Sequence, residues 1–275
     1  MTYQAHIGSG GLAGWDLLNR TASRQRQLVA NDRETREACS QFRDRIGAVT
    51  AADELVSDYR LMKVALGAFG LEGDIASKAF IRKVLESDLS DQSSLANRLS
   101  NKAYRRLSEA FGFTRTGDEQ SSAGFSSDAG FADSIIARYV NREFEARVGD
   151  SDQNLRLALN ARREMAEVSA RSGTNNTKWY EVLGNIPLRR VFEGAFGFGH
   201  SYGRLPIDRQ MEEFSEAASR LFGTDDMRRI AQPENVEKLI RTFLARGSVT
   251  SGDVSNRFST ALTLLSTAPL SLGSY

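Results

Sequence analysis

The sequence predicts an all-α, multi-helix protein, and three observations carry this prediction. Apolar residues recur at spacings of three and four over most of the chain, which is the period of an amphipathic helix. All four prolines lie after residue 186, so nothing before that point breaks a helix in the way that proline does. Segments that alternate apolar and polar residues and are rich in Val, Ile and Thr, as strands are, are hard to find.

Residues 1–49 are predicted to form an N-terminal arm and helices. We expect the Gly-rich start of this region to be mobile. The first helix carries a narrow apolar stripe, formed by Trp15, Leu18, Ala22 and Val29. Such a stripe needs a partner, which is either the helical body of the same chain or a helix of another subunit.

Residues 50–113 are predicted to form a first helical unit. The segment Thr50–Asp53 has the residue types of a helix start, with an acid in the first turn. Apolar residues then follow at helical spacing, which predicts a helix over about residues 51–66 and a break at Gly67 and Gly70. Asp74 can cap the next helix.

Residues 114–127 are polar and rich in Gly and Ser, which predicts a loop or linker and the best internal boundary. Residues 128–249 are predicted to form a second helical unit. It begins with two long amphipathic helices joined by a short turn, which favours an antiparallel hairpin. Residues 250–275 are predicted to form a C-terminal helix and tail, with an apolar stripe of Val254, Phe258, Ala261 and Leu265.

A short motif, Gly-Ala-Phe-Gly, occurs at residues 67–70 and again at residues 194–197. Glycine is expected to end each helix here because it accepts a left-handed or close-packed backbone. A second alignment sets Tyr104, Leu107 and Phe111 against Val236, Leu239 and Phe243. The two regions are therefore interpreted as related helical units, although short matches also arise by chance. Burial is predicted for four aromatic residues: Phe69, Phe111, Phe196 and Phe243.

Composition and charge exclude several classes of function. Lys and Arg total 36 against 35 Asp and Glu, so the formal charge of +1 gives no field that would attract nucleic acid or an anionic surface. The single cysteine, Cys39, excludes an internal disulfide framework and a multi-cysteine zinc site. Two histidines, His6 and His200, leave little for a metal site or a catalytic triad. We therefore predict no cofactor, no metal and no nucleic-acid partner.

The chain has no run of about 18 apolar residues, so no membrane insertion is predicted. Its start lacks the charged and apolar regions of a cleaved secretory signal. A cytoplasmic protein fits this pattern, and so does a client of an export route without a cleaved signal.

Two motifs imitate known sites. Residues 199–203, Gly-His-Ser-Tyr-Gly, match the nucleophile elbow of hydrolases, but no histidine follows Ser201 to act as base. Residues 150–154 imitate the start of a calcium loop, but Leu155 stands where the turn needs glycine. We predict a Gly-rich loop at the first motif and a helix N-cap at the second, and no catalytic residue at either.

Paired charges are interpreted in the same way. Four arginine pairs are expected on solvated helix faces, because acids lie near them and no aromatic residues are interleaved: Arg105-Arg106, Arg162-Arg163, Arg189-Arg190 and Arg228-Arg229. The carboxylates Glu212-Glu213 and Asp225-Asp226 are neighbours only in sequence and point in different directions on a helix. Cys39 has no histidine partner and is expected to be a spectator thiol.

The segment from Val64 to Phe113, VALGAFGLEGDIASKAFIRKVLESDLSDQSSLANRLSNKAYRRLSEAFGF, resembles a bacterial family of unknown biochemical function. The family is found mainly in alphaproteobacteria and is often encoded among flagellar genes. The resemblance extends upstream through Gly11–Trp15, Arg20-Thr21 and Thr50–Asp53. It implies an assembly, structural or export-related role, and it carries over no catalytic or ligand residue.

The sequence thus leads to a non-enzymatic structural or interaction protein associated with the bacterial flagellum, with protein partners and with self-association open. The alternative is a cytosolic adaptor, or a chaperone-like binder of an exported flagellar subunit, that uses a groove between helices. An enzyme of unrecognised type is the third interpretation.

Overall fold

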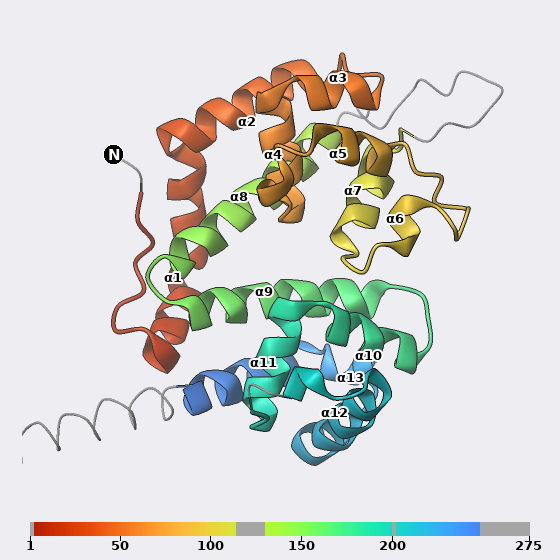
Figure 1. The fold of residues 1–275 in the computed structure, drawn as a ribbon. Coiled ribbons are helices and arrows are strands. Elements are labelled where there is room, and N and C mark those ends of the chain that lie inside the picture. Colours follow the sequence, from red (N-terminus) through yellow and green to blue (C-terminus); the bar gives the residue numbers. More distant parts are fainter. Residues whose placement is uncertain (1–2, 114–129, 200–201, 248–275) are drawn as a thin grey trace, which may run out of the picture. The chain divides into compact units, whose positions relative to one another are not determined.

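The computed structural model describes residues 3–113, 130–199 and 202–247. Within these ranges all regular structure is helical and no strand is present (Figure 1). The predicted fold class is confirmed. The predicted linker at residues 114–127 and the C-terminal stripe of residues 254–265 lie outside the described ranges.

The chain divides into two compact units. Unit 1 comprises Met1–Gly8 with Asp16–Arg156, and unit 2 comprises Ser9–Trp15 with Leu157–Tyr275. We expected the division at residues 114–127, but it falls directly after Arg156. The long helix after the linker, α8, therefore belongs with the first helices and not with the second unit. The predicted hairpin crosses the division, so its packing stays a prediction.

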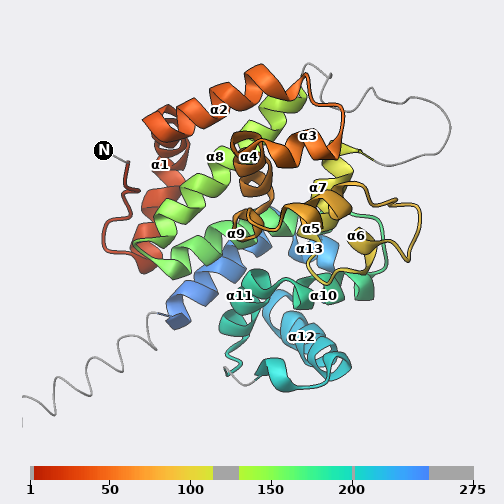
Figure 2. The same ribbon diagram turned by 45° about the horizontal axis from the view of Figure 1, so that its top comes forward.

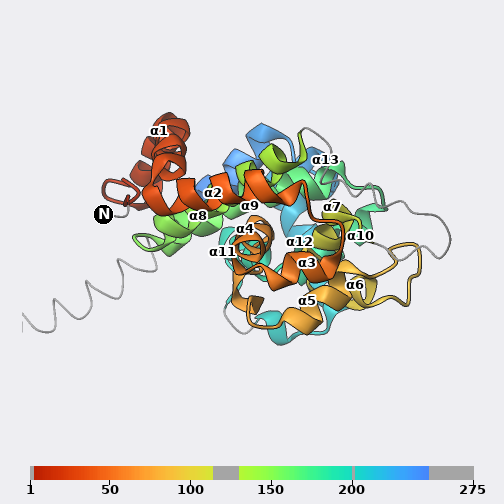
Figure 3. The same ribbon diagram turned by 90° about the horizontal axis from the view of Figure 1, so that it is seen from above.

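Unit 1 is built around one buried helix, α4, which lies against α2 and α8 (Figures 2 and 3). Every residue of α4 from Val64 to Phe69 is buried, because the helix is apolar on nearly all sides. The helices that supply this unit are α1 (Gly11–Asn31, shared with unit 2), α2 (Arg33–Ile46), α3 (Ala52–Ser57), α4 (Tyr59–Phe69), η1 (Glu72–Asp74), α5 (Lys78–Leu85), α6 (Leu95–Arg98), α7 (Ala103–Phe111) and α8 (Phe131–Gly149).

The helix predicted over residues 51–66 is two helices, α3 and α4, separated at Asp58. The backbone of Asp58 is extended, and its carboxylate accepts hydrogen bonds from the N–H groups of Arg60 and Leu61 at 2.9 and 3.3 Å. A side chain that caps the backbone in this way competes with a continuous helix. The apolar periodicity does not reveal this break, because the apolar spacing continues across it.

Asp74 does not cap the following helix, contrary to the prediction. It ends η1, and its carboxylate accepts a hydrogen bond from the Tyr104 hydroxyl at 2.7 Å. The residue before α5 is Ser77. The acid therefore ties α7 to the turn that follows α4, a contact between residues that are 30 positions apart.

Unit 2 has a core of aromatic side chains in which Trp179, Phe192 and Phe214 are buried. Its helices are α9 (Gln153–Ala170, which begins in unit 1), α10 (Asn175–Gly184), α11 (Ile186–Phe196), η3 (Tyr202–Arg204), α12 (Ile207–Phe222), α13 (Met227–Ile230) and a last described helix over residues 233–247. Lys178 is buried and donates to the carbonyl oxygens of Val168, Ser169 and Arg171, in the last turn of α9 and directly after it, at 2.8 to 3.0 Å. The ammonium thereby satisfies helix C-terminal carbonyls that would otherwise lack donors.

The apolar stripe of the first helix is covered within the chain. Trp15, Leu18 and Val29 are buried, and Ala22 is half-buried. The Trp15 indole donates to Glu237 at 2.9 Å, and the Arg162 guanidinium lies over its ring at 4.1 Å. Of the two partners considered for this stripe, the helical body of the same chain is the one observed.

The start of the chain is also ordered, which contradicts the expected mobility. Ala5 and Ile7 are buried although residues 3–7 form no helix. Gln25 of α1, Arg147 of α8 and Asp32, which lies between α1 and α2, hold this segment through its backbone. Its order therefore comes from tertiary contacts and not from local propensity.

Candidate functional site

The two Gly-Ala-Phe-Gly segments form corners with the same backbone geometry. Gly70 ends α4 at φ +72°, and Gly197 ends α11 at φ +80°. In the residue after each glycine, the N–H donates to a carbonyl five positions earlier, from Leu71 to Leu66 and from Phe198 to Glu193, at 2.9 Å in both corners. This is the Schellman arrangement, and it confirms the predicted left-handed glycine.

The first glycine of each motif allows an aromatic ring to approach the helix backbone. A Cβ atom on Gly67 would lie 2.8 Å from the ring of Tyr139, and one on Gly194 would lie 2.6 Å from the ring of Phe243. Both distances are shorter than any real Cβ contact. Glycine is therefore required at these positions by packing as well as by the turn that follows.

An arginine three residues beyond the aromatic covers the last glycine of each corner. Arg142 lies against Gly70, and its Nη2 donates to the carbonyl of Phe69 at 3.3 Å. Arg246 lies against Gly197 in the same way. In each corner, therefore, one helix supplies the glycines and a second helix supplies the aromatic residue and the arginine.

The aromatic partner of the first corner corrects the second sequence alignment. Phe111 was aligned with Phe243, but the ring that rests on Gly67 belongs to Tyr139 of α8. A signal for this pairing is present in the sequence, as an aromatic residue followed by two residues and an arginine: Tyr139-Val140-Asn141-Arg142 and Phe243-Leu244-Ala245-Arg246.

The phenylalanines of the two corners differ. Phe69 is buried, and the Arg138 guanidinium lies over its ring at 5.7 Å. Phe196 is half-buried, so its predicted burial is wrong. Its ring contacts three others, those of Phe192, Phe198 and Phe214, with centroids 5.5 to 5.7 Å apart. Burial is confirmed for the other three predicted residues, Phe69, Phe111 and Phe243.

Charged groups gather beside the first corner, between α2, α4 and α8. Lys63 pairs with Glu34 at 2.6 Å, and the Tyr139 hydroxyl donates to Glu143. Burial is the main cause that raises the pKa of Glu143, and it also raises the pKa of Tyr139. Burial raises the pKa of Cys39 to about 11, so this thiol is protonated at neutral pH and is a poor nucleophile.

The motifs that imitate known sites are structural wherever they are described. Asp152 accepts hydrogen bonds from the N–H groups of Asn154 and Leu155 at 2.8 and 3.1 Å, as the N-cap of α9. Asp226 caps α13 by accepting from the Arg228 N–H at 3.0 Å, while Asp225 accepts from the Ser215 hydroxyl at 2.8 Å. His200 and Ser201 of the elbow-like motif lie outside the described residues.

Several arginines of the basic pairs contact acids, as predicted, but Arg106, Arg163 and Arg189 are half-buried and do not lie on fully solvated faces. Arg163 bonds Glu164 at 2.5 Å, Arg189 lies 3.2 Å from Glu193, and Arg162 lies 3.5 Å from Glu237. In the described ranges, no group of three or more His, Cys, Asp or Glu side chains could hold a metal ion. None of the helices in the described part of the chain is long and apolar enough to cross a membrane.

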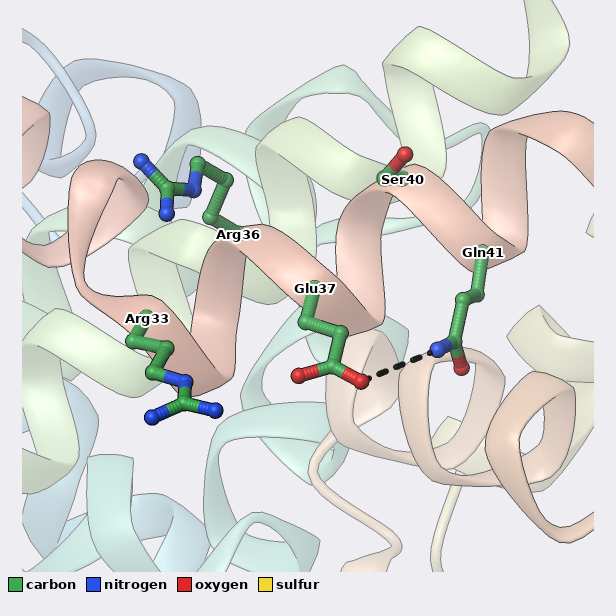
Figure 4. A pocket seen from close by; sticks show the side chains of 5 residues that line it. All are labelled: Arg33, Arg36, Glu37, Ser40 and Gln41. Atoms are coloured by element: carbon green, nitrogen blue, oxygen red, sulfur yellow. Dashed lines mark hydrogen bonds between the residues drawn. The ribbon is translucent and has the colours of Figure 1, made fainter.

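A hollow of about 420 Å³ lies on the surface of α2 (Figure 4). All the residues that line it come from this one helix: Arg33, Arg36, Glu37, Ser40 and Gln41. All are exposed except Gln41, which is half-buried and donates to Glu37 at 3.2 Å. The hollow lacks buried polar groups aimed into it, so its geometry favours no ligand.

Large apolar side chains are exposed on three successive helices of unit 2. Tyr180 of α10, Ile186 of α11 and Ile207 of α12 are 38%, 54% and 47% exposed. The Tyr180 hydroxyl donates to Asp208 at 2.7 Å, which places its ring beside the start of α12. We call these three residues the unit-2 apolar surface.

Comparisons with known proteins give the family of this chain and a similar fold. A family model described as "Protein of unknown function (DUF1217)" matches residues 68–236, more than half of the chain. The chain is similar to a crystal structure of protein AGR_C_984 from Agrobacterium tumefaciens, with a TM-score of 0.71 and 24% identity over 91% of this chain and 98% of that chain. At that identity the likeness concerns the fold. No curated protein matches. The chain belongs to the DUF1217 family, whose function is unknown.

Proposed function

We propose that this protein is a non-enzymatic structural or interaction protein associated with the bacterial flagellum. The unit-2 apolar surface is the observation that carries the interaction role. Exposed large apolar side chains are ordinary when they are scattered singly, but neighbouring ones mark contact sites for other proteins. The Tyr180–Asp208 hydrogen bond brings Tyr180 beside the start of α12, where Ile207 lies, and the exposed Ile186 begins the helix that follows α10.

The positions of these side chains favour a role in binding over one in folding. Ile186 and Ile207 are each the first residue of a helix, and each is about half exposed. Neither side chain is needed to start its helix, because Asn185 caps α11 and Pro206 precedes α12. Contact of an isoleucine side chain with water is unfavourable, and its burial by a partner would lower the free energy of the complex.

The flagellar part of the proposal rests on the resemblance of residues 64–113 to a family often encoded among flagellar genes. The similar fold from Agrobacterium, an alphaproteobacterium, fits the group of bacteria in which that family is found. The alternative function, a cytosolic adaptor or chaperone-like binder of an exported flagellar subunit, would use the same surface.

Fractionation of flagellated cells that carry the tagged full chain tests the proposal. Recovery in purified filaments, hooks or culture medium would support a structural part. Strict recovery in the cytosol, together with a flagellar subunit, would support the adaptor. Equal recovery from cells with and without flagellar genes, in the same fraction and without such a subunit, would contradict both.

The double variant Ile186→Asp/Ile207→Asp tests the surface itself. Aspartate in the first turn of a helix is favourable, so we expect the melting temperature to be unchanged or slightly raised. Flagellar recovery should fall. Tyr59→Asp is the matched control, because Tyr59 is also the first residue of a helix, is 59% exposed and lies in unit 1. Equal loss in the control would show that the unit-2 apolar surface is not the contact site.

We also propose that the two glycine corners derive from a duplicated helical unit. The support is that the same parts occur in the same order: a capped helix, two glycines, a Schellman turn, and a later helix with an aromatic residue and an arginine. Superposition of α4 with α8 on α11 with residues 233–247 tests this, in the present structure and in relatives. If the two helix pairs crossed at unrelated angles, the proposal of a duplication would be refuted.

A further inference from the structure

The first described residues pack against the helices of unit 1. Along residues 3–7 the side chains alternate between covered and exposed, with Ala5 and Ile7 buried and Gln4 and His6 exposed. Alternation of this kind is characteristic of an extended chain with one face against a surface. We call residues 3–7 the N-terminal strap.

One buried side chain of α1 binds the backbone of the strap. The side-chain oxygen of Gln25 accepts from the N–H of His6 at 2.8 Å, and its amide nitrogen donates to the carbonyl of the same residue at 2.8 Å. The Tyr3 hydroxyl and the Thr21 hydroxyl complete its partners at 3.0 and 2.9 Å. Gln25 is only 5% exposed and offers the strap the same donor and acceptor pair as a neighbouring strand would.

A buried ion pair binds the strap at Tyr3, three residues before His6. Arg147 of α8 donates to the carbonyl of Tyr3 at 3.1 Å and to Asp32 and Thr35 at 2.9 and 3.1 Å. Hydrogen bonds from Arg147 and from the backbone N–H of Tyr3 lower the pKa of Asp32. The side chains of Arg147 and Asp32 are 9% and 7% exposed.

These contacts form a peptide site in which buried polar groups take hydrogen-bond partners from the peptide that occupies it. They reach mainly the backbone of the strap, and the strap adds two buried apolar side chains. If the strap left, Gln25 and Arg147 would lose partners inside a buried setting, which is costly unless another chain replaced them. We call the seat formed by Thr21, Gln25, Asp32, Thr35 and Arg147 the strap groove.

A glycine hinge joins the strap to α1. Gly8, Gly10 and Gly11 have φ values of +59°, +74° and +53°. Glycine adopts positive and negative φ almost equally well, so this turn can open into an extended link with little strain. A short hinge between a segment and its seat is the arrangement from which identical copies exchange segments.

We propose that the strap groove is a peptide-binding site that also takes the N-terminal strap of a second copy of this chain, so that copies associate by exchange of straps. The second copy is the partner whose sequence fits, because residues 3–7 already match the groove in their backbone bonds and their buried side chains. The proposal is independent of the flagellar assignment.

Two full-length variants test the exchange. Ala5→Asp/Ile7→Asp places charges on the buried face of the strap and leaves the groove free. Gln25→Ala weakens the groove and leaves the strap intact. Each variant alone should be a monomer, and a mixture should form a 1:1 complex of twice the monomer mass by light scattering. A mixture that stays monomeric would overturn the proposal, provided that circular dichroism and thermal melting show both variants to be folded.

A labelled peptide of residues 1–8 provides a second measurement. It should bind the Ala5→Asp/Ile7→Asp chain and should bind the wild-type chain at least about tenfold more weakly, because the tethered strap competes at high effective concentration. Addition of Gln25→Ala to the first chain should abolish binding, and a peptide with Ile7→Asp should not bind. Equal binding to wild type and variant, or binding by the peptide without complex formation between the two variants, would refute strap exchange.

Discussion

The corners at Gly70 and Gly197 share a backbone and differ in what surrounds it. Both have the left-handed glycine, the Schellman bonds, an aromatic ring on the first glycine and an arginine on the last. In unit 1 the corner phenylalanine is buried beneath a guanidinium, whereas in unit 2 it is half-buried among other rings. The backbone of each corner, and the arginine that covers its last glycine, which we call the arginine clamp, are thus the same in both units. The side chains around the corner phenylalanine differ.

The largest expected difference between the corners comes from truncation of their phenylalanines. Phe69→Ala should lower the free energy of unfolding by about 3 to 5 kcal/mol, because it leaves a cavity in a closed core. Phe196→Ala should cost about 1 to 3 kcal/mol, because the ring is partly solvated and its neighbours can relax. Urea unfolding followed by circular dichroism measures both. Equal losses would mean that the two phenylalanines have the same role after all.

The next effect tests the aromatic ring on the first glycine. Gly67→Ala and Gly194→Ala should each cost about 1 to 3 kcal/mol, since the new Cβ overlaps the ring of Tyr139 or Phe243. Gly184→Ala is the control, because nothing lies within 4 Å of a Cβ there. If both corner variants unfolded at the same urea concentration as the control, the rings of Tyr139 and Phe243 would not lie as close to these glycines as described.

A smaller effect separates backbone strain from the arginine clamp. Gly70→Ala and Gly197→Ala should each cost about 1 to 2 kcal/mol from the left-handed backbone alone, plus the displacement of Arg142 or Arg246. Gly223→Ala has the same backbone strain at φ +74° with open space around it. Thermal melting should therefore place Gly223→Ala above both corner variants. A lower melting temperature for this control would argue against the clamp.

The smallest effect concerns the residues that start the two glycine helices. Asp58 accepts from two N–H groups of α4, and Asn185 accepts from the Leu188 N–H of α11 at 3.3 Å. Replacement of either by alanine should cost about 1 kcal/mol. Asp58→Asn keeps the cap and should restore most of the loss in denaturant unfolding, apart from the ion pair with Arg45. Asn185→Asp should not restore it, because the Asn185 amide donates to the buried Glu164 at 3.1 Å and an aspartate would place a like charge there. Failure of Asp58→Asn to restore stability would assign the loss at Asp58 to contacts other than the cap.

Local chemistry made part of this fold predictable. Helical class followed from apolar periodicity, and the ends of α4 and α11 followed from glycine, because both depend on residues close together in the chain. The break at Asp58 was missed because the apolar spacing runs through it. The unit-2 apolar surface was missed because exposure depends on which neighbours cover a side chain, which periodicity does not tell.

The sequence by itself determined the helical class, the glycine ends of α4 and α11 and the N-cap at Asp152, since a few neighbouring residues decide each of these. Only the tertiary structure decided that Tyr139 and not Phe111 rests on Gly67, and that Gln25 and Arg147 hold the first residues of the chain. The physical reason is that these contacts join residues from 19 to 144 positions apart. Their partners are selected by how whole helices pack, and many pairings satisfy the same local pattern.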